Sequence, residues 1–309
     1  MKNAPYILGD WGTSNLRLYL CGMDGSILGE KTGPGIAEVR EKAGDIFLSI
    51  IEDWTNEHGP MQATLSGMVG ANIGWREIPY LECPLAISEV SHKLESFRAE
   101  DHQITIIPGM RAINPLGAPD VMRGEETQIF GAMQLLPQLR EGDHLFCLPG
   151  THTKWVKTKN GRLETFLTAV SGELFGLFHS HSVLLDKTST PPSEITPAFE
   201  AGLSRTRTLN ETALLHLFFE VRSQQLTGAL SAEEAVAYLS GLITGRDVSG
   251  ALATFGEAAI SSCILVGADM LTNLYNAAFK LHNISVETLS GQAASIAGLK
   301  AVHTSLQEA

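Results

Sequence analysis

Apolar and polar positions along the chain predict an arrangement of strands that occurs twice. Two short apolar strands, residues 6–9 and 16–21, are expected around a turn at residues 10–14 that is rich in glycine and hydroxyl groups. A third strand follows at 26–33. A helical pattern, with apolar residues three or four positions apart, then runs through residues 47–54. The chain therefore opens with a three-stranded meander followed by a helix.

The same layout returns at residues 144–168. The segment HLFCLPGTHTKWVKTKNGRLETFLT contains an apolar strand, a Gly-Thr-x-Thr turn, a return strand, an Asn-Gly hairpin turn and a third strand. Between the two copies, buried strands are expected at 63–67 and 104–110, with a helix at about 125–139. After them, the pattern is mainly helical, with a strand and helix within 260–279 and another pair at the C-terminus. Two lobes of similar topology are predicted.

The two turns are candidate phosphate-binding loops. Backbone N–H groups and hydroxyls, presented from two facing turns, can hold a polyphosphate from both sides. Asp10 in the first turn is a candidate Mg²⁺ ligand, because Mg²⁺ takes one or two carboxylates together with waters and phosphate oxygens. The alternative is an aspartate that only caps its own turn. Arg17 is either a counter-charge for Asp10 or a surface residue, and Lys154 either meets phosphate or is a solvated lysine on its strand.

Composition and charge exclude several classes of protein. The 309 residues have a net charge of −12 and contain no run of lysine and arginine, so a nucleic-acid partner is not expected. The four cysteines are widely spaced, which argues against disulfide frameworks and metal cages and favours buried free thiols in the cytoplasm. Polar residues interrupt every apolar run before about 18 residues, so no membrane association is expected.

Two further segments carry polar groups that suit a small ligand. MRGEETQ places Glu125 and Glu126 at the start of a predicted helix. The alternative to a functional role is that the helix dipole stabilises acidic side chains at this position. Neighbouring helical positions point about 100° apart, so at most one of the two is expected to face a given site. Arg123 could balance these acids or bind a substrate carboxylate. SGMVGANIGW, with Asn72 among three glycines, is either a sugar pocket or a plain loop.

Six segments together resemble a known kinase family. GDWGTSNLR, SGMVGANIGWREIPYLECP, DVMRGEETQIFGA, LPGTHTKWV, FLTAVSGELFGLFHSHS and YLSGLITGRD are similar to the 2-dehydro-3-deoxygalactonokinases. More widely, the two turns resemble the two phosphate loops of the actin-like, sugar-kinase and Hsp70 ATPase superfamily, and LVGADMLTNLY resembles its adenosine-contacting strand-to-helix element. The resemblance implies an α/β fold of two lobes, each with a ribonuclease H-like core, and an interlobe cleft. One departure is that Leu148 and Pro149 stand where the second loop of the superfamily usually carries an Asp.

The resemblance also implies roles for individual residues. Asp10 would be catalytic and hold Mg²⁺, and Glu126 is slightly preferred over Glu125 as the catalytic acid, by its match to exopolyphosphatase-like relatives. The expected ATP-binding residues are Gly12, Thr13, Ser14, Arg17, Gly150, Thr151, Thr153, Lys154, Gly267 and Ala268. The expected substrate-binding residues are Gly67, Asn72, Glu77, Tyr80 and Arg123.

The expected activity is transfer of the γ-phosphoryl group of ATP to the 6-hydroxyl of 2-dehydro-3-deoxy-D-galactonate, in galactonate catabolism. The expected N-terminal lobe is residues 1–140, rejoined by a C-terminal helix at 288–309, and the other lobe is 141–287. Two alternatives are a nucleotide or polyphosphate hydrolase on the same scaffold and a non-enzymatic sugar-binding regulator. A homodimer is left open, as is the preference between galactonate and gluconate epimers.

Overall fold

The computed structural model describes residues 4–308 except 187–188, 191–193, 209–212, 257–259 and 261. Two six-stranded sheets form the framework, and their strands run in corresponding orders. The first sheet has the order β3-β2-β1-β4-β8-β7. Its strands are β1 (Tyr6–Trp11), β2 (Asn15–Cys21), β3 (Ile27–Pro34), β4 (Gln62–Gly67), β7 (Ser96–Ala99) and β8 (His102–Ile106).

The second sheet has the order β15-β14-β11-β12-β13-β6. Its strands are β6 (Leu85–Ala86), β11 (Asp143–Leu148), β12 (Thr153–Lys159), β13 (Arg162–Ala169), β14 (Ser262–Gly267) and β15 (Ser285–Ser290). In each sheet an antiparallel meander, β1-β2-β3 or β11-β12-β13, is extended by two parallel strands, β4 and β8 or β14 and β15. This shared order confirms the repeated ribonuclease H-like core.

The N-terminal segment contributes one strand to the second sheet. β6 pairs with β13 through Leu85 and Ala86, so the predicted lobe 1–140 does not coincide fully with one sheet. A small third sheet has the order β10-β9-β5. It consists of β5 (Leu81–Glu82), β9 (Met110–Ile113) and β10 (Pro119–Met122).

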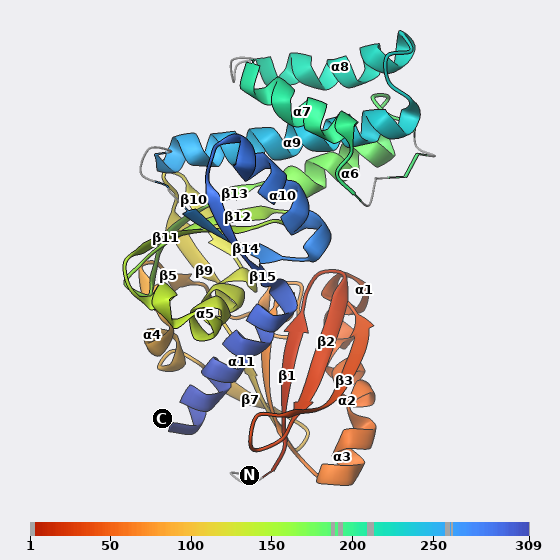
Figure 1. The fold of residues 1–309 in the computed structure, drawn as a ribbon. Helices are drawn as coiled ribbons and strands as arrows, with labels where there is room; N and C mark the ends of the chain where they lie inside the picture. The colour runs from red at the N-terminus through yellow and green to blue at the C-terminus, as the bar shows by residue number, and fades with distance from the viewer. Residues whose placement is uncertain are drawn as a thin grey trace.

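Helices cover both large sheets. The helices are α1 (Ile36–Val39), α2 (Ala43–Ile50), α3 (Glu52–His58), α4 (Ile87–Ser91), α5 (Glu125–Leu135), α6 (Ser171–His181), α7 (Pro197–Thr208), α8 (Leu214–Leu226), α9 (Ala232–Phe255), α10 (Asp269–Leu281) and α11 (Gly291–Glu308). Figure 1 shows α6 to α9 gathered at the end of the molecule farthest from β1 to β3, whereas α5 and α11 lie side by side near the middle. No helix in the described part of the chain is long and apolar enough to cross a bilayer.

Two predicted helices are shorter than the pattern suggested. The pattern at 47–54 is divided between α2 and α3. The helix expected to reach residue 139 ends at Leu135, and residues 137–140 form a short 3₁₀ turn. Pro137 explains this end, because proline has no N–H to donate and disfavours helical backbone at the residue before it.

Helices α5 and α11 cross with their backbones in contact. A Cβ atom added to Gly131 of α5 would lie 1.8 Å from the carbonyl oxygen of Ala294 in α11. One added to Gly298 of α11 would lie 1.9 Å from the carbonyl oxygen of Thr127 in α5. Glycine is therefore required on both sides of the crossing. Ile129, Phe130, Leu299 and other apolar residues of the two helices join the core that also contains Phe146 and Val156 of the second sheet.

We expect Gly131→Ala to lower the free energy of unfolding by about 2–3 kcal/mol, because the added methyl group forces the two helices apart. Gly250→Ala in α9 is the matched control, since its Cβ would meet nothing within 4 Å. That substitution should raise stability by up to about 1 kcal/mol through helix propensity. Urea unfolding of the two variants measures the difference. Equal stabilities would show that α5 and α11 do not touch at Gly131.

Candidate active site

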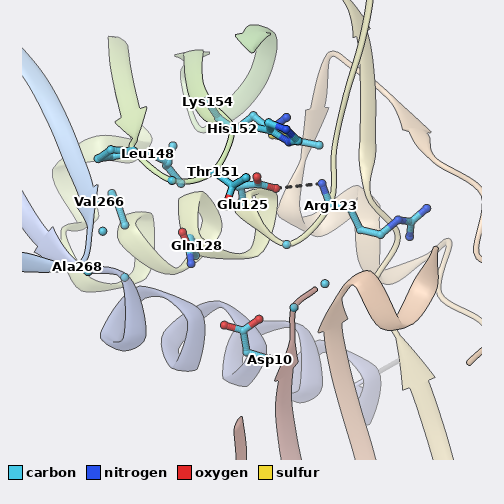
Figure 2. Close-up of a pocket in the computed structure, with 18 of the residues that line it drawn as sticks. Asp10, Arg123, Glu125, Gln128, Leu148, Thr151, His152, Lys154, Val266 and Ala268 are labelled. Carbon is cyan, nitrogen blue, oxygen red and sulfur yellow. Dashed lines mark hydrogen bonds between the residues drawn. The ribbon is translucent and has the colours of Figure 1, made fainter. Parts of the chain in front are cut away.

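A cavity of about 790 Å³ lies where the carboxyl ends of the central strands of both large sheets meet. Its lining comes from the β1–β2 turn, the end of β4, the start of α5, the β11–β12 turn and the starts of α10 and α11. Figure 2 shows Asp10 on one side and Glu125, Thr151 and Lys154 on the opposite side. The two predicted loops therefore face one cavity, as expected.

The first turn is held closed by the backbone N–H of Gly12, which donates to the carbonyl of Asn15 at 2.9 Å. Gly12, Thr13 and Arg17 line the cavity together with Asp10. Ser14, also expected to bind ATP, is exposed and does not line it. The turn thus presents backbone and one hydroxyl to the cavity, rather than the two hydroxyls expected.

Asp10 lies at the end of β1, opposite Arg17 of β2 in the antiparallel register. The hydroxyl of Ser295 in α11 donates to its Oδ2 at 3.3 Å. Burial raises the pKa of Asp10, and the nearby Arg17 charge and the Ser295 hydrogen bond oppose that rise. Asp10 is therefore a carboxylate tied to α11 rather than one that caps its own turn.

Glu125 begins α5 and points into the cavity. The preceding Gly124 has φ of 109°, a conformation that favours glycine, and turns the chain from β10 into the helix. The backbone N–H of Arg123 donates to Glu125 Oε2 at 3.0 Å (Figure 2). Burial raises the pKa of Glu125, and the positive charge of Lys154 lowers it. A carboxyl group with a raised pKa suits proton transfer.

Glu126 lies behind the helix start and is 0% exposed. Its carboxyl oxygens accept the N–H of Gly124 at 2.7 Å and the hydroxyl of Thr127 at 3.0 Å. Burial and the charge of Glu125 raise its pKa from 4.5 to about 8. The preference for Glu126 as the acid that faces the site is thus corrected: of the two adjacent positions, Glu125 points into the cavity and Glu126 into the core.

Lys154 directs a partly satisfied ammonium group toward the same region. It is 5% exposed, and its Nζ donates to the carbonyl of Val121 and the hydroxyl of Thr168, both at 2.9 Å. Asp120 in turn accepts from the hydroxyl and backbone N–H of Thr168. An ammonium group has three protons, so one remains for a ligand. Lys154 is a buried lysine of the cavity wall, not a solvated one.

The second turn presents Gly150 and Thr151 to the cavity. Thr153, expected beside them, is 0% exposed, and its hydroxyl is 2.8 Å from the hydroxyl of Tyr275. The Thr153 side chain is therefore buried against Tyr275 and does not line the cavity. His152 pairs with Glu173 of α6 at 2.6 Å. The expected Gly267 and Ala268, at the end of β14, also line the cavity.

At the other end, Gly67, Tyr80 and Arg123 line the cavity, whereas Asn72 and Glu77 do not. Those last two residues are exposed on the 71–80 loop and are not part of the cavity lining, which corrects the expectation for them. Close packing explains two of the glycines around Asn72, because a Cβ atom on Gly70 would lie 2.8 Å from Arg123 Nη1 and one on Gly74 would lie 2.3 Å from the carbonyl oxygen of Val69.

Arg123 is the most unusual group at this end. Its guanidinium lies 4.3 Å from the centre of the Tyr80 ring, and Nη2 donates to the carbonyl of Ile78 at 2.7 Å. Nε and Nη1 are buried and have no hydrogen-bond partner. A buried guanidinium with two unused donors costs free energy unless a ligand, above all a carboxylate, supplies acceptors.

A second cavity of about 300 Å³ adjoins the first at residues 149–151. It is enclosed by the starts of α6 and α10 and by the middle of α9. Most of its lining is apolar and includes Phe175, Ile243, Met270 and Leu274. One wall of this cavity comes from LVGADMLTNLY, the segment expected to contact adenosine by its resemblance, whereas the contributions of α6 and α9 were not predicted, because no local motif links them.

Further lining residues were also missed. Gln128 lies one helical turn after Glu125, and Asp269 follows Ala268 directly, so helical spacing and adjacency could have indicated both. Gln292 and the Asp10 partner Ser295 lie in α11, far away in the sequence. No pattern in the sequence predicts their approach.

The carboxylates in the cavity suit a Mg²⁺ ion that a nucleotide brings with it. Within the described residues, no group of three or more His, Cys, Asp or Glu side chains could hold a metal alone. Asp10 and Glu125 nevertheless line the same cavity, and Mg²⁺ commonly takes one or two carboxylates plus phosphate oxygens and waters. The donor set thus fits a metal that is shared with phosphate.

Comparison with known proteins gives consistent matches. Residues 10–302 match the family described as 2-keto-3-deoxy-galactonokinase. A protein of Rhizobium meliloti named as a probable 2-dehydro-3-deoxygalactonokinase is 36% identical over 307 residues, covering 97% of each chain. The 2-dehydro-3-deoxygalactonokinase of Escherichia coli is 34% identical over 301 residues, again with 97% of each chain covered.

Solved structures agree. A crystal structure of a proposed 2-dehydro-3-deoxygalactonokinase from Sinorhizobium meliloti has a TM-score of 0.87 at 35% identity, covering 97% of this chain and 99% of that one. An activator of a 2-hydroxyisocaproyl-CoA dehydratase from Clostridium difficile, solved with ADPNP, has a TM-score of 0.52 at 13% identity, which bears on the fold alone. The fold is the two-lobed actin-like ATPase fold.

We expect Glu126→Gln to remove a pH dependence of stability. Because folding raises the pKa of Glu126 from 4.5 to about 8, the folded state holds this proton more tightly. The stabilisation is complete below about pH 4.5 and declines as pH rises to about 8, by at most about 1.4 kcal/mol per pH unit. Denaturant unfolding of both proteins from pH 5 to 9 measures this difference.

Glutamine keeps an acceptor for Gly124 and Thr127 but carries no charge. The free energy of unfolding of the variant should therefore rise relative to that of the wild type as pH increases to 8, with no further relative increase above pH 8. Glu41→Gln, at an exposed position, should run parallel to the wild type. A Glu126→Gln curve that also runs parallel would show that Glu126 is not a buried, proton-retaining acid.

Proposed function

This chain belongs to the 2-keto-3-deoxy-galactonokinase family, and we propose that it transfers the γ-phosphoryl group of ATP to the 6-hydroxyl of 2-dehydro-3-deoxy-D-galactonate. The observation that carries the proposal is a single cavity with two different ends. One end has two glycine- and threonine-containing turns, and the other has Arg123, whose Nε and Nη1 have no hydrogen-bond partner. A polyphosphate suits the first end, and a small carboxylate suits the second.

The nucleotide occupies the end formed by the second sheet. Its phosphates lie between the turns at Gly12 and Gly150, where backbone N–H groups and the hydroxyls of Thr13 and Thr151 can donate. The apolar cavity of about 300 Å³ beyond Gly150 takes the base, because a flat aromatic ring suits such a lining. The third proton of Lys154 faces the transferred phosphoryl group.

The sugar acid occupies the end formed by Gly67, Tyr80 and Arg123. Its carboxylate accepts from the free Nε and Nη1 of Arg123, which replaces two unsatisfied donors by charge-assisted hydrogen bonds. Stacking on Tyr80 and the bond to Ile78 keep the guanidinium plane in place before the substrate arrives. The distal hydroxyl of the substrate then points toward Glu125 and the phosphates.

Glu125 is the proposed base. It accepts the proton of the 6-hydroxyl while that oxygen forms a bond to the γ-phosphorus and the bond from this phosphorus to the β–γ bridging oxygen breaks, leaving ADP. Asp10, across the cavity from Glu125, would hold Mg²⁺, which neutralises phosphate charge when bound. Closure of the proposed lobes, 1–140 with 288–309 against 141–287, would exclude water from the cavity.

The rival hydrolase would use Glu125 to activate water instead. A hydrolase would not use the free donors of Arg123, because the two turns already bind the phosphates of a polyphosphate or nucleotide. A regulator that only binds sugar would not need two acidic side chains beside the phosphate turns. The kinase accounts for both features.

ATP consumption across a panel of 2-keto-3-deoxy sugar acids, and of matching sugars without the carboxylate, tests the proposal. We expect the wild-type protein to turn over the acids and to produce a 6-phosphate, detected by ³¹P NMR. Phosphate release with ATP alone should be much slower. Arg123→Met should raise the KM for the acid by a factor of about 10–100, by loss of a charged hydrogen-bonded pair, without changing the KM for ATP.

Arg76→Met is the matched control, because Arg76 also stacks on an aromatic ring, 4.8 Å from the centre of Phe97, but outside the cavity. It should leave both KM values unchanged. Lack of turnover of every sugar acid, or rapid release of phosphate from ATP alone, would contradict the kinase assignment. Equal turnover of the acids and the uncharged sugars would show that Arg123 does not bind the substrate carboxylate.

A further inference from the structure

The YLSGLITGRD segment ends in an aspartate that the account so far leaves unused. Asp247 lies in α9, and its carboxylate accepts hydrogen bonds from three other elements. Trp155 Nε1 of β12 donates to Oδ1 at 2.7 Å, and the hydroxyls of Ser171 in α6 and Tyr275 in α10 donate to Oδ2. These three donors are neutral side chains, and Trp155 and Tyr275 are almost fully buried.

The Asp247 cluster is linked to the second phosphate turn through Tyr275. The Tyr275 hydroxyl donates to Asp247 and lies 2.8 Å from the hydroxyl of Thr153, the residue that ends the turn. Ser171 and Tyr275 also line the cavity assigned to the base. Asp247 thus fixes the wall of that cavity and one end of the turn together.

The start of α6 supports the turn from its other side. Glu173 N–H donates to the carbonyl of Thr151 at 2.9 Å. A Cβ atom on Gly172 would lie 2.3 Å from the carbonyl oxygen of Gly150, so the helix and the turn are in direct contact. Because Ser171 precedes these two residues, the bond from Ser171 to Asp247 holds the first turn of α6 against residues 150–151.

We propose that Asp247 is a positioning residue for the nucleotide: it holds the second phosphate turn and the wall of the adjoining cavity in fixed positions relative to each other. This inference rests on the proposed function, since it takes ATP as the ligand of the turn. Burial raises the pKa of Asp247 and the bonds from Ser171, Tyr275 and Trp155 oppose that rise, in keeping with a carboxylate that its neighbours hold in place. Asp247 lines neither cavity, so it acts through Ser171 and Tyr275.

The substitutions Asp247→Ala and Asp247→Asn test this role. Alanine leaves the donors of Trp155, Ser171 and Tyr275 without their acceptor, so the turn and α6 can move apart. Asparagine keeps the oxygen for Trp155, and its amide can donate to the two hydroxyls after they rotate. We expect alanine to weaken binding of Mg²⁺-AMPPNP about tenfold and asparagine to keep it within about threefold of the wild type.

Calorimetry with Mg²⁺-AMPPNP alone gives the nucleotide affinity without any acceptor, and steady-state kinetics give the KM for each substrate. For Asp247→Ala, the KM for ATP should rise and that for the sugar acid should stay within about twofold. Glu220→Ala is the control, because Glu220 accepts from Arg205 and Tyr238 in the same group of helices but lines neither cavity. It should lower thermal stability without changing nucleotide affinity.

Unchanged nucleotide affinity in Asp247→Ala would overturn the proposal. The same holds if Glu220→Ala weakens the nucleotide equally, or if Asp247→Ala weakens both substrates equally, since either result indicates a general structural role. Failure of the kinase assignment is distinguishable. In that case the wild-type protein does not phosphorylate the sugar acid, whereas the comparison of nucleotide affinities still decides the role of Asp247.

Discussion

The contact of α5 with α11 at Gly131 and Gly298 determines where the acidic groups of the site lie. Each glycine faces a carbonyl oxygen of the other helix with no room for a side chain. The start of α5 carries Glu125, and the first turns of α11 carry the hydroxyl of Ser295 that reaches Asp10. Because the helices cannot slide or separate without breaking this contact, it holds the two carboxylates on opposite sides of one cavity.

Different burial gives the adjacent residues Glu125 and Glu126 different roles. Glu126 is enclosed by its own helix start and retains a proton to higher pH, whereas Glu125, one position earlier, faces the cavity near Lys154. At the far end, Arg123 is held by Tyr80 and Ile78 and keeps two donors unused. A cavity that is acidic in the middle and cationic at one end suits a metal-bound polyphosphate beside a small carboxylate.

Features set by local sequence could be predicted, and those set by packing between distant segments could not. The repeated meander and both phosphate turns follow from alternating apolar residues and glycine-hydroxyl turns, and the structure places both turns at the cavity. The composition of the segment around Asn72 and Glu77 predicted a substrate pocket, but both side chains are exposed. The choice between Glu125 and Glu126 depends on which face of α5 packs into the core and which faces the cavity. The Asp247 cluster joins four elements that are distant in sequence, so no motif could reveal it.

The most direct test of this account is the turnover of Glu125→Gln beside that of Glu126→Gln, with nucleotide and sugar-acid affinities measured for both. If Glu125 accepts the proton of the attacking hydroxyl, its glutamine variant should bind both ligands normally and lose a factor of about 100 or more in kcat. Glu126→Gln should keep most of its kcat, because its carboxyl group faces the core. Full activity of Glu125→Gln together with an inactive, folded Glu126→Gln would contradict the account.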